Sequence, residues 1–222
     1  VTALDLRSFR IAGKIRLPAA PSRILVNGKN AFALTPENGS IHTLDVENLT
    51  TTASLRLADD IILARFTPDG THIAGLGGQS RELVIADPHN RKLVKRLPLA
   101  STPFDMDMGP TEPQEGKPIY AGVSGGDSGT VELFNLTTGT RQQTNLDGPI
   151  GNLRFRKDAQ ITLVANYHSQ ALSVFDTASL GAICDLPVAM RPENLCFSGD
   201  FGQLFLSGAG MDGVAIVFLY NM

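Results

Sequence analysis

The chain has 222 residues, of which 42% are hydrophobic and 18% are charged, and its formal net charge is −3. This balance is typical of a folded globular protein and excludes an intrinsically disordered one. Lysine and arginine are scattered with no run longer than two, and no apolar stretch approaches the length of a membrane span. We therefore expect neither nucleic-acid binding nor membrane insertion.

Short runs of valine, isoleucine, leucine, phenylalanine and threonine extend from the first residues to the last. They are separated by 22 glycines and 13 prolines, and almost no segment keeps a helical apolar period over several turns. This pattern predicts an all-β fold. The first residues form no signal peptide and include no initiator methionine, so we expect the sequence to be part of a longer gene product.

In chain order, five predicted strands end in an aspartate or asparagine that opens a turn. The spacings between these residues are 40, 42, 48 and 41 positions, and the longest contains an insertion at Gly109–Pro118. A side chain of this type accepts backbone N–H groups of the turn that follows, so a catalytic role is not expected. The five residues are Asp5, Asp45, Asp87, Asn135 and Asp176.

A second repeated position lies on the first strand of each unit and is occupied by Val26, Phe66, Met108, Phe155 and Phe197. Each unit of about forty residues holds four short strands, which is the period of a β-propeller blade. We therefore predict one β-propeller domain over residues 1–222. Its blades span approximately residues 1–17 (partial), 18–57, 58–99, 100–146, 147–186 and 187–222 (partial).

The order of proline entry, strand, PDG-like turn, strand, glycine-rich loop and Asp-ended strand resembles the YVTN-type β-propeller repeat, whose relatives include lactonase-like propellers. FTPDGTHIAGL (66–76) and FSGDFGQLFLSG (197–208) show the resemblance best. A WD40 repeat fits less well, because the chain has no tryptophan. The resemblance implies a bacterial protein, usually with seven blades, in the periplasm, secreted or on the cell surface.

About five blades are present in the sequence. We expect missing chain to supply the remaining blades of a seven-bladed ring. The alternative is a closed five-bladed propeller, in which residues 1–17 would complete the last blade.

One position of the first strand carries opposite charges in successive blades: Arg65, Asp107 and Arg154. Because the first strands of adjacent blades are neighbours, we predict an Arg65–Asp107–Arg154 ion ladder between blades. A partly buried Asp107 without such partners would be costly to keep charged. Asp105 and Asp107 could instead face a cation or act as an acid–base pair, but the later acidic ligands of a calcium loop are missing.

Polar residues gather at the start of the first strands and in the loops between the second and third strands. Both sets are expected at one mouth of the central channel, where a small molecule or a peptide would bind. A solvated polar rim explains them equally well. The candidate residues are Arg23, Asp105, Asn152, Glu193, Asn194, Tyr167 and His168.

No motif for a catalytic, metal or cofactor site is complete, and we expect no catalytic residue, metal or cofactor. The glycines of the formal G-x-G-x-x-G at Gly208, Gly210 and Gly213 precede a strand-forming run, whereas a dinucleotide site needs a helix. The four histidines lack metal-ligand spacing. Cys184 and Cys196 are expected to be free, buried thiols.

The leading hypothesis is a non-catalytic propeller that binds a protein, a peptide or a small molecule, or serves as a scaffold. The alternative is a lactonase-like hydrolase that acts at the channel mouth, although no catalytic residue of that family can be carried over. An electron-transfer propeller similar to amine dehydrogenase subunits is disfavoured, because the chain has neither a haem-attachment motif nor a tryptophan.

Overall fold

The computed structural model describes residues 1–218, and the regular structure of this part is β-strand with two short 3-10 helices, so the all-β fold class is confirmed. Residues 219–222, the end of the last predicted blade, lie outside the described residues. The chain divides into two compact units. Unit 1 comprises Val1–Phe66 and Gly70–Pro98, and unit 2 comprises Thr67–Asp69 and the described residues from Leu99 onward.

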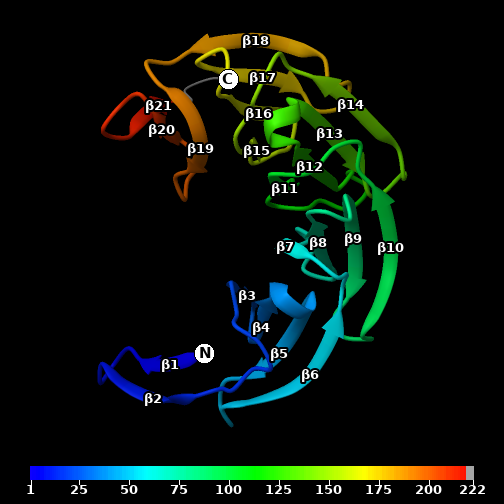
Figure 1. Cartoon of the computed structure of the whole chain (residues 1–222), viewed down its shortest axis with the longest axis vertical. Helices are drawn as coiled ribbons and strands as arrows, with labels where there is room; N and C mark the ends of the chain where they lie inside the picture. The colour runs from blue at the N-terminus through cyan, green and yellow to red at the C-terminus, as the bar shows by residue number, and fades with distance from the viewer. Residues whose placement is uncertain (219–222) are drawn as a thin grey trace. The chain divides into compact units, whose positions relative to one another are not determined.

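Unit 1 contains one two-stranded and two four-stranded antiparallel sheets (Figure 1). The two-stranded sheet pairs β1 (Thr2–Asp5) with β2 (Arg10–Lys14). The next sheet contains β3 (Arg23–Asn27), β4 (Asn30–Thr35), β5 (Ser40–Asp45) and β6 (Thr50–Arg56), with the 3-10 helix η1 (Pro36–Asn38) between β4 and β5. The third contains β7 (Ile61–Phe66), β8 (Ile73–Gly77), β9 (Glu82–Asp87) and β10 (Lys92–Pro98).

Unit 2 contains two four-stranded sheets and one three-stranded sheet within the described residues. The first contains β11 (Asp105–Gly109), β12 (Tyr120–Ser124), β13 (Thr130–Asn135) and β14 (Arg141–Asn145), with the 3-10 helix η2 (Gly126–Ser128) between β12 and β13. The second contains β15 (Leu153–Phe155), β16 (Ile161–Asn166), β17 (Ala171–Asp176) and β18 (Ala182–Pro187). The third contains β19 (Arg191–Phe197), β20 (Gln203–Ala209) and β21 (Ala215–Phe218).

Burial changes from the middle of each four-stranded sheet to its last strand. All five residues of β8 are buried, as are the first five of β13, whereas six of the seven residues of β10 are exposed. A strand that is buried on both faces needs apolar residues at successive positions rather than alternating ones. This explains the short apolar runs of the sequence, because the second and third strands of each four-stranded sheet are largely buried.

The hydrophobic cores lie between successive sheets of the same unit. In unit 1 the core joins the β3–β6 and β7–β10 sheets through Leu34, Ile41, Ile61 and Ile73, all at most 2% exposed. In unit 2 one core joins the first two sheets and another joins the last two. Each such buried side chain stabilises the fold by roughly 1.5–3 kcal/mol relative to an exposed one.

The five Asx turns form as predicted. The side chains of Asp5, Asp45, Asp87, Asn135 and Asp176 accept backbone N–H groups from residues two or three positions later, at 2.8–3.4 Å. The Asn48 side chain and its backbone N–H both donate to Asp45, which lowers the pKa of that carboxyl. These residues therefore shape turns, and the expectation that they are structural is confirmed.

Both cysteines are free, but the expectation that they are buried is wrong. Cys184 lies on β18, the last strand of its sheet, which is exposed along most of its length. Cys196 lies between Leu195 and Phe197 on β19, and those two neighbours contact the core shared with the β15–β18 sheet. Because side chains alternate along a strand, Cys196 points to the opposite face.

Candidate functional site

Three polar side chains on or beside the first strands of unit 2 connect one sheet to the next. Each accepts a backbone N–H group from the first strand of the following sheet. The bonds run from Leu153 to Asp105 (3.4 Å), from Phe155 to Asp107 (3.0 Å) and from Leu195 to Asn152 (3.2 Å). When the repeats are aligned, each N–H donor stands one position later in its repeat than the side chain that accepts it. The first strands of successive sheets are therefore offset by the same amount in all three contacts.

The guanidinium of Arg154 forms an ion pair with Asp105, and the two side chains are only 17% and 9% exposed. Arg154 also donates to the side-chain oxygen of Asn152 at 3.4 Å. The partner found for Arg154 is thus Asp105, whereas the predicted ladder paired Arg154 with Asp107. Arg65 belongs to unit 1, and its pairing with Asp107 stays a prediction.

The predicted channel-mouth residues differ in whether they bond to a neighbouring sheet, are exposed to solvent or line a cleft. Asp105 and Asn152 are engaged in the contacts between sheets described above. Asn194 is exposed, with its amide 3.4 Å from the Ser207 hydroxyl. The remaining candidates of unit 2 are the exposed His168 and two residues, Tyr167 and Glu193, that line a cleft. Arg23 is an exposed residue of unit 1.

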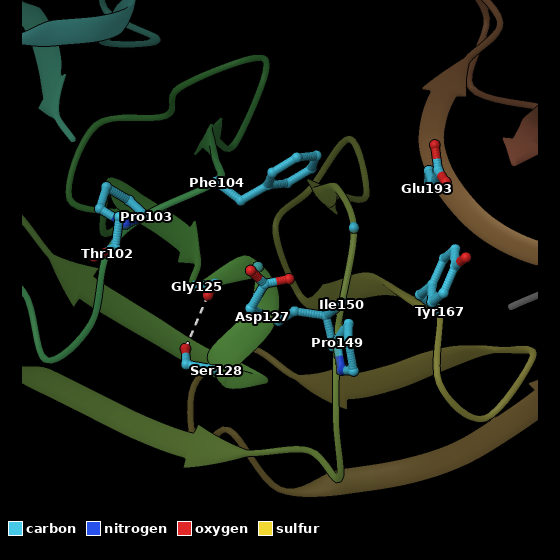
Figure 2. Close-up of a pocket in the computed structure, with 12 residues that line it drawn as sticks. Thr102, Pro103, Phe104, Gly125, Asp127, Ser128, Pro149, Ile150, Tyr167 and Glu193 are labelled. Carbon is cyan, nitrogen blue, oxygen red and sulfur yellow. Dashed lines mark hydrogen bonds between the residues drawn. The ribbon is translucent and has the colours of Figure 1, made fainter. Parts of the chain in front are cut away.

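The cleft has a volume of about 810 Å³ and is formed within unit 2 (Figure 2). Its walls come from all three sheets of the unit. The entry segments of β11 and β15, the loop that contains η2, the loop after β16 and the strand β19 each contribute. The lining residues are Thr102, Pro103, Phe104, Gly125, Gly126, Asp127, Ser128, Pro149, Ile150, Gly151, Tyr167 and Glu193.

One repeat position supplies a wall of this cleft. In three successive sheets, the residue four positions before the repeated position of the first strand (Met108, Phe155 or Phe197) lines the cleft. These residues are Phe104, Gly151 and Glu193. Phe104 is 50% exposed although it is a large apolar residue. A Cβ atom built on Gly151 would lie 2.2 Å from the Glu193 carbonyl oxygen, so only glycine permits this close approach of the two backbones. The glycine therefore lets β19 lie against the entry segment of β15, which places Glu193 at the wall of the cleft.

A β-bulge directs Glu193 into the cleft. The pairing of β19 with β20 shifts between Pro192 and Asn194, which leaves Glu193 as the extra residue. Its carbonyl accepts the Asn152 N–H at 2.7 Å, so the bulged backbone is held by the neighbouring sheet. A bulge re-aims a side chain and often stands beside a functional site. Here it presents an exposed carboxylate on the cleft wall.

The facing wall is the loop that contains η2, which carries Asp127. The Ser128 hydroxyl donates to the Gly125 carbonyl at 2.8 Å, and Ile150 N–H donates to the Gly126 carbonyl at 3.0 Å. The loop is therefore held by one hydrogen bond within its own turn and by another from the entry segment of the next sheet. Figure 2 shows the carboxylate of Asp127 in the open space below the ring of Phe104.

Tyr167 forms the side of the cleft near Glu193 (Figure 2). The guanidinium of Arg191 lies 5.6 Å from the centre of its ring, a cation–π distance. Among the lining residues, only Asp127 and Glu193 carry a formal charge at neutral pH. The cleft therefore combines exposed aromatic surface with two carboxylates.

Two absences concern residues 1–218, the part of the chain that the structure describes. No group of three or more histidine, cysteine, aspartate or glutamate side chains in that range could hold a metal ion. None of the helices described there is long and apolar enough to cross a membrane.

Sequence reasoning named Tyr167 and Glu193 but missed Phe104 and the role of Gly151. The repeat alignment contains the signal, because one position holds a phenylalanine, a glycine and a glutamate in succession. In the same three sheets the preceding position is apolar (Pro103, Ile150 and Pro192) and the following position is polar (Asp105, Asn152 and Asn194). A repeat position whose residue type changes in every sheet is not fixed by packing in the core. Such a position indicates a surface that differs from blade to blade.

The comparisons with known proteins support the fold. No protein-family model and no curated protein matches the sequence. Among solved structures, a chain of the mitotic checkpoint complex matches at 16% identity and a TM-score of 0.78, covering 99% of this chain and 68% of its own. The β-propeller domain of Cps50 (Swd1) from Myceliophteria thermophila matches at 13% identity and a TM-score of 0.75, covering 96% of this chain and 69% of its own.

A protein of unknown function from Desulfotomaculum acetoxidans matches at 12% identity and a TM-score of 0.79, covering all of this chain and 72% of its own. At such low identity these similarities bear on the fold alone and select neither the YVTN nor the WD40 repeat family. The succession of four-stranded antiparallel sheets and these structural neighbours agree: the chain has a β-propeller fold.

Proposed function

We propose that this protein is a non-catalytic binding propeller that holds a short segment of a partner protein in the cleft of unit 2. The observation that carries the proposal is the exposed Phe104 ring at the wall of a cleft of about 810 Å³. Large aromatic residues that are exposed beside a concave surface are typical of binding sites.

The construction of the cleft also supports binding. Its walls are backbone segments fixed by hydrogen bonds between sheets, such as Asn152 N–H to the Glu193 carbonyl, so the site is formed before a ligand arrives. A preformed site reduces the ordering cost of association. Its volume lies within the range of roughly 300–1,000 Å³ for ligand sites, which suits a few side chains of a peptide.

The hydrolase alternative receives no such support. A lactonase-like mechanism at the predicted mouth would use Asp105 and Asn152 to hold a substrate or a metal. Both side chains instead accept backbone N–H groups of the next sheet, and Asp105 also pairs with Arg154. We therefore propose binding and not hydrolysis.

The test is a selection of random linear peptides, displayed on phage, against the purified protein. Selected peptides should bind in solution, and Phe104→Ala should weaken them about tenfold, because a central aromatic anchor contributes more than about 1 kcal/mol. The matched control is Ile183→Ala, which removes an equally exposed apolar side chain on β18, outside the cleft. Peptides that bind both variants equally, or a selection that yields none, would contradict the proposal.

A further inference from the structure

The two charged residues that line the cleft carry charge of the same sign. Asp127 and Glu193 are exposed carboxylates that come from different sheets, and the other lining residues are uncharged at neutral pH. Figure 2 shows them on two sides of the open space, with Phe104 and Tyr167 also at its border. A ligand in this space would meet negative charge from two directions.

The aromatic rings add a second preference. A guanidinium or ammonium group is attracted to the face of an aromatic ring, and its alkyl stem packs on apolar surface. The Arg191 guanidinium, which is not among the lining residues, lies 5.6 Å from the centre of the Tyr167 ring and already makes that ring's cation–π contact, so Phe104 is the ring left for a ligand. Buried Pro103 and Ile150 supply apolar surface in the same cleft.

We propose that the partner segment presents a lysine or arginine side chain to this cleft, with its charge between Asp127 and Glu193 and its stem against Phe104. This inference rests on the proposed function and specifies the chemistry of the partner. Charge complementarity selects against an acidic segment, and against nucleic acid, because a phosphate would face the two carboxylates.

The test uses the peptides selected for the proposed function. They should share a lysine or arginine next to an apolar residue, and replacing that basic residue with glutamine should weaken binding about tenfold. The variant Asp127→Asn/Glu193→Gln should weaken the basic peptide by a similar factor and the glutamine peptide hardly at all. Binding of the basic peptide should also fall as salt concentration rises.

The matched control is Glu112→Gln/Glu115→Gln, which removes two exposed carboxylates of the same unit outside the cleft. It should change affinity less than twofold. If neutral or acidic peptides are selected and Phe104→Ala weakens them, the cleft binds peptides but the inference about charge is wrong. If the double variant in the cleft binds the basic peptide as tightly as the wild type does, the inference is equally overturned. If no peptide is selected, the proposed function fails and the inference fails with it.

Discussion

Replacing Asp105 with asparagine removes the negative charge from an ion pair that lies between two sheets. The side chains of Arg154 and Asp105 are 17% and 9% exposed, so water replaces little of the lost interaction. In Asp105→Asn the amide oxygen can still accept the Leu153 N–H, so the main loss is the counter-charge of the guanidinium. Removing one partner of a buried pair destabilises a protein by about 3–5 kcal/mol. Because Arg154 keeps some contact with water and also reaches Asn152, we expect a loss of about 2–3 kcal/mol.

The assay is urea unfolding at neutral pH followed by circular dichroism, since the chain has no tryptophan to report by fluorescence. Arg154→Met and the double variant complete a double-mutant cycle, in which the two losses should add to much more than the loss of the double variant. Asp158→Asn is the control, because its 2.7 Å pair with Arg156 has side-chain exposures of 42% and 21%. That control should lose less than about 1 kcal/mol. Equal losses in Asp105→Asn and Asp158→Asn, with additive effects in the cycle, would refute the reasoning.

Three further predictions follow from turns and exposure. The pKa of Asp45 is lowered in the folded protein, so its carboxylate contributes stability above about pH 3.9, and this stability is lost as the pH falls through the pKa of the folded state. Asp45→Asn should therefore lose less stability on acidification than the wild type does, as measured by thermal unfolding at neutral and acidic pH. Gly28 and Gly39 have φ of +59° and +60°, but a Cβ at Gly39 would lie 1.6 Å from a backbone carbonyl oxygen whereas one at Gly28 meets nothing within 4 Å. In urea unfolding, Gly28→Ala should cost about 1–2 kcal/mol and Gly39→Ala clearly more, and equal costs would show that conformation alone decides. Cys184 and Cys196 should both react with a thiol reagent in the folded protein, and reaction only after denaturation would contradict their exposure.

Local hydrogen bonding made much of the fold predictable. An aspartate at the end of a strand accepts N–H groups two and three residues later, so the turn depends on residues adjacent in sequence. The five such turns could therefore be located without knowledge of the neighbouring sheets. The apolar positions of the first strands in unit 2 were equally predictable, because their packing repeats from sheet to sheet, whereas Ile24 at the same position of β3 is 44% exposed. Leu153 and Leu195, for example, stand at the same position and are at most 2% exposed.

Contacts between sheets were harder to predict. They depend on how far the first strand of one sheet is shifted relative to that of the next, and the sequence of a single repeat does not specify this shift. Aligning the repeats places Asp107 and Arg154 at the same position, which suggests that they face each other. The backbone bonds show instead that each side chain contacts the next sheet one position further along, as Asp107 does with Phe155 N–H. The guanidinium of Arg154 pairs with Asp105, which stands two repeat positions before it.

The cleft depends on differences between repeats, whereas the alignment identifies what repeats share. Phe104, Gly151 and Glu193 occupy equivalent positions and have no chemistry in common, so no shared pattern marks them. Their effect arises only when three sheets stand side by side, with the glycine allowing the close approach of the backbone that carries the carboxylate. The fold constrains the neighbouring apolar positions and leaves this one free to vary. A repeat position that changes from blade to blade is therefore where a propeller can acquire a specific ligand without altering its core.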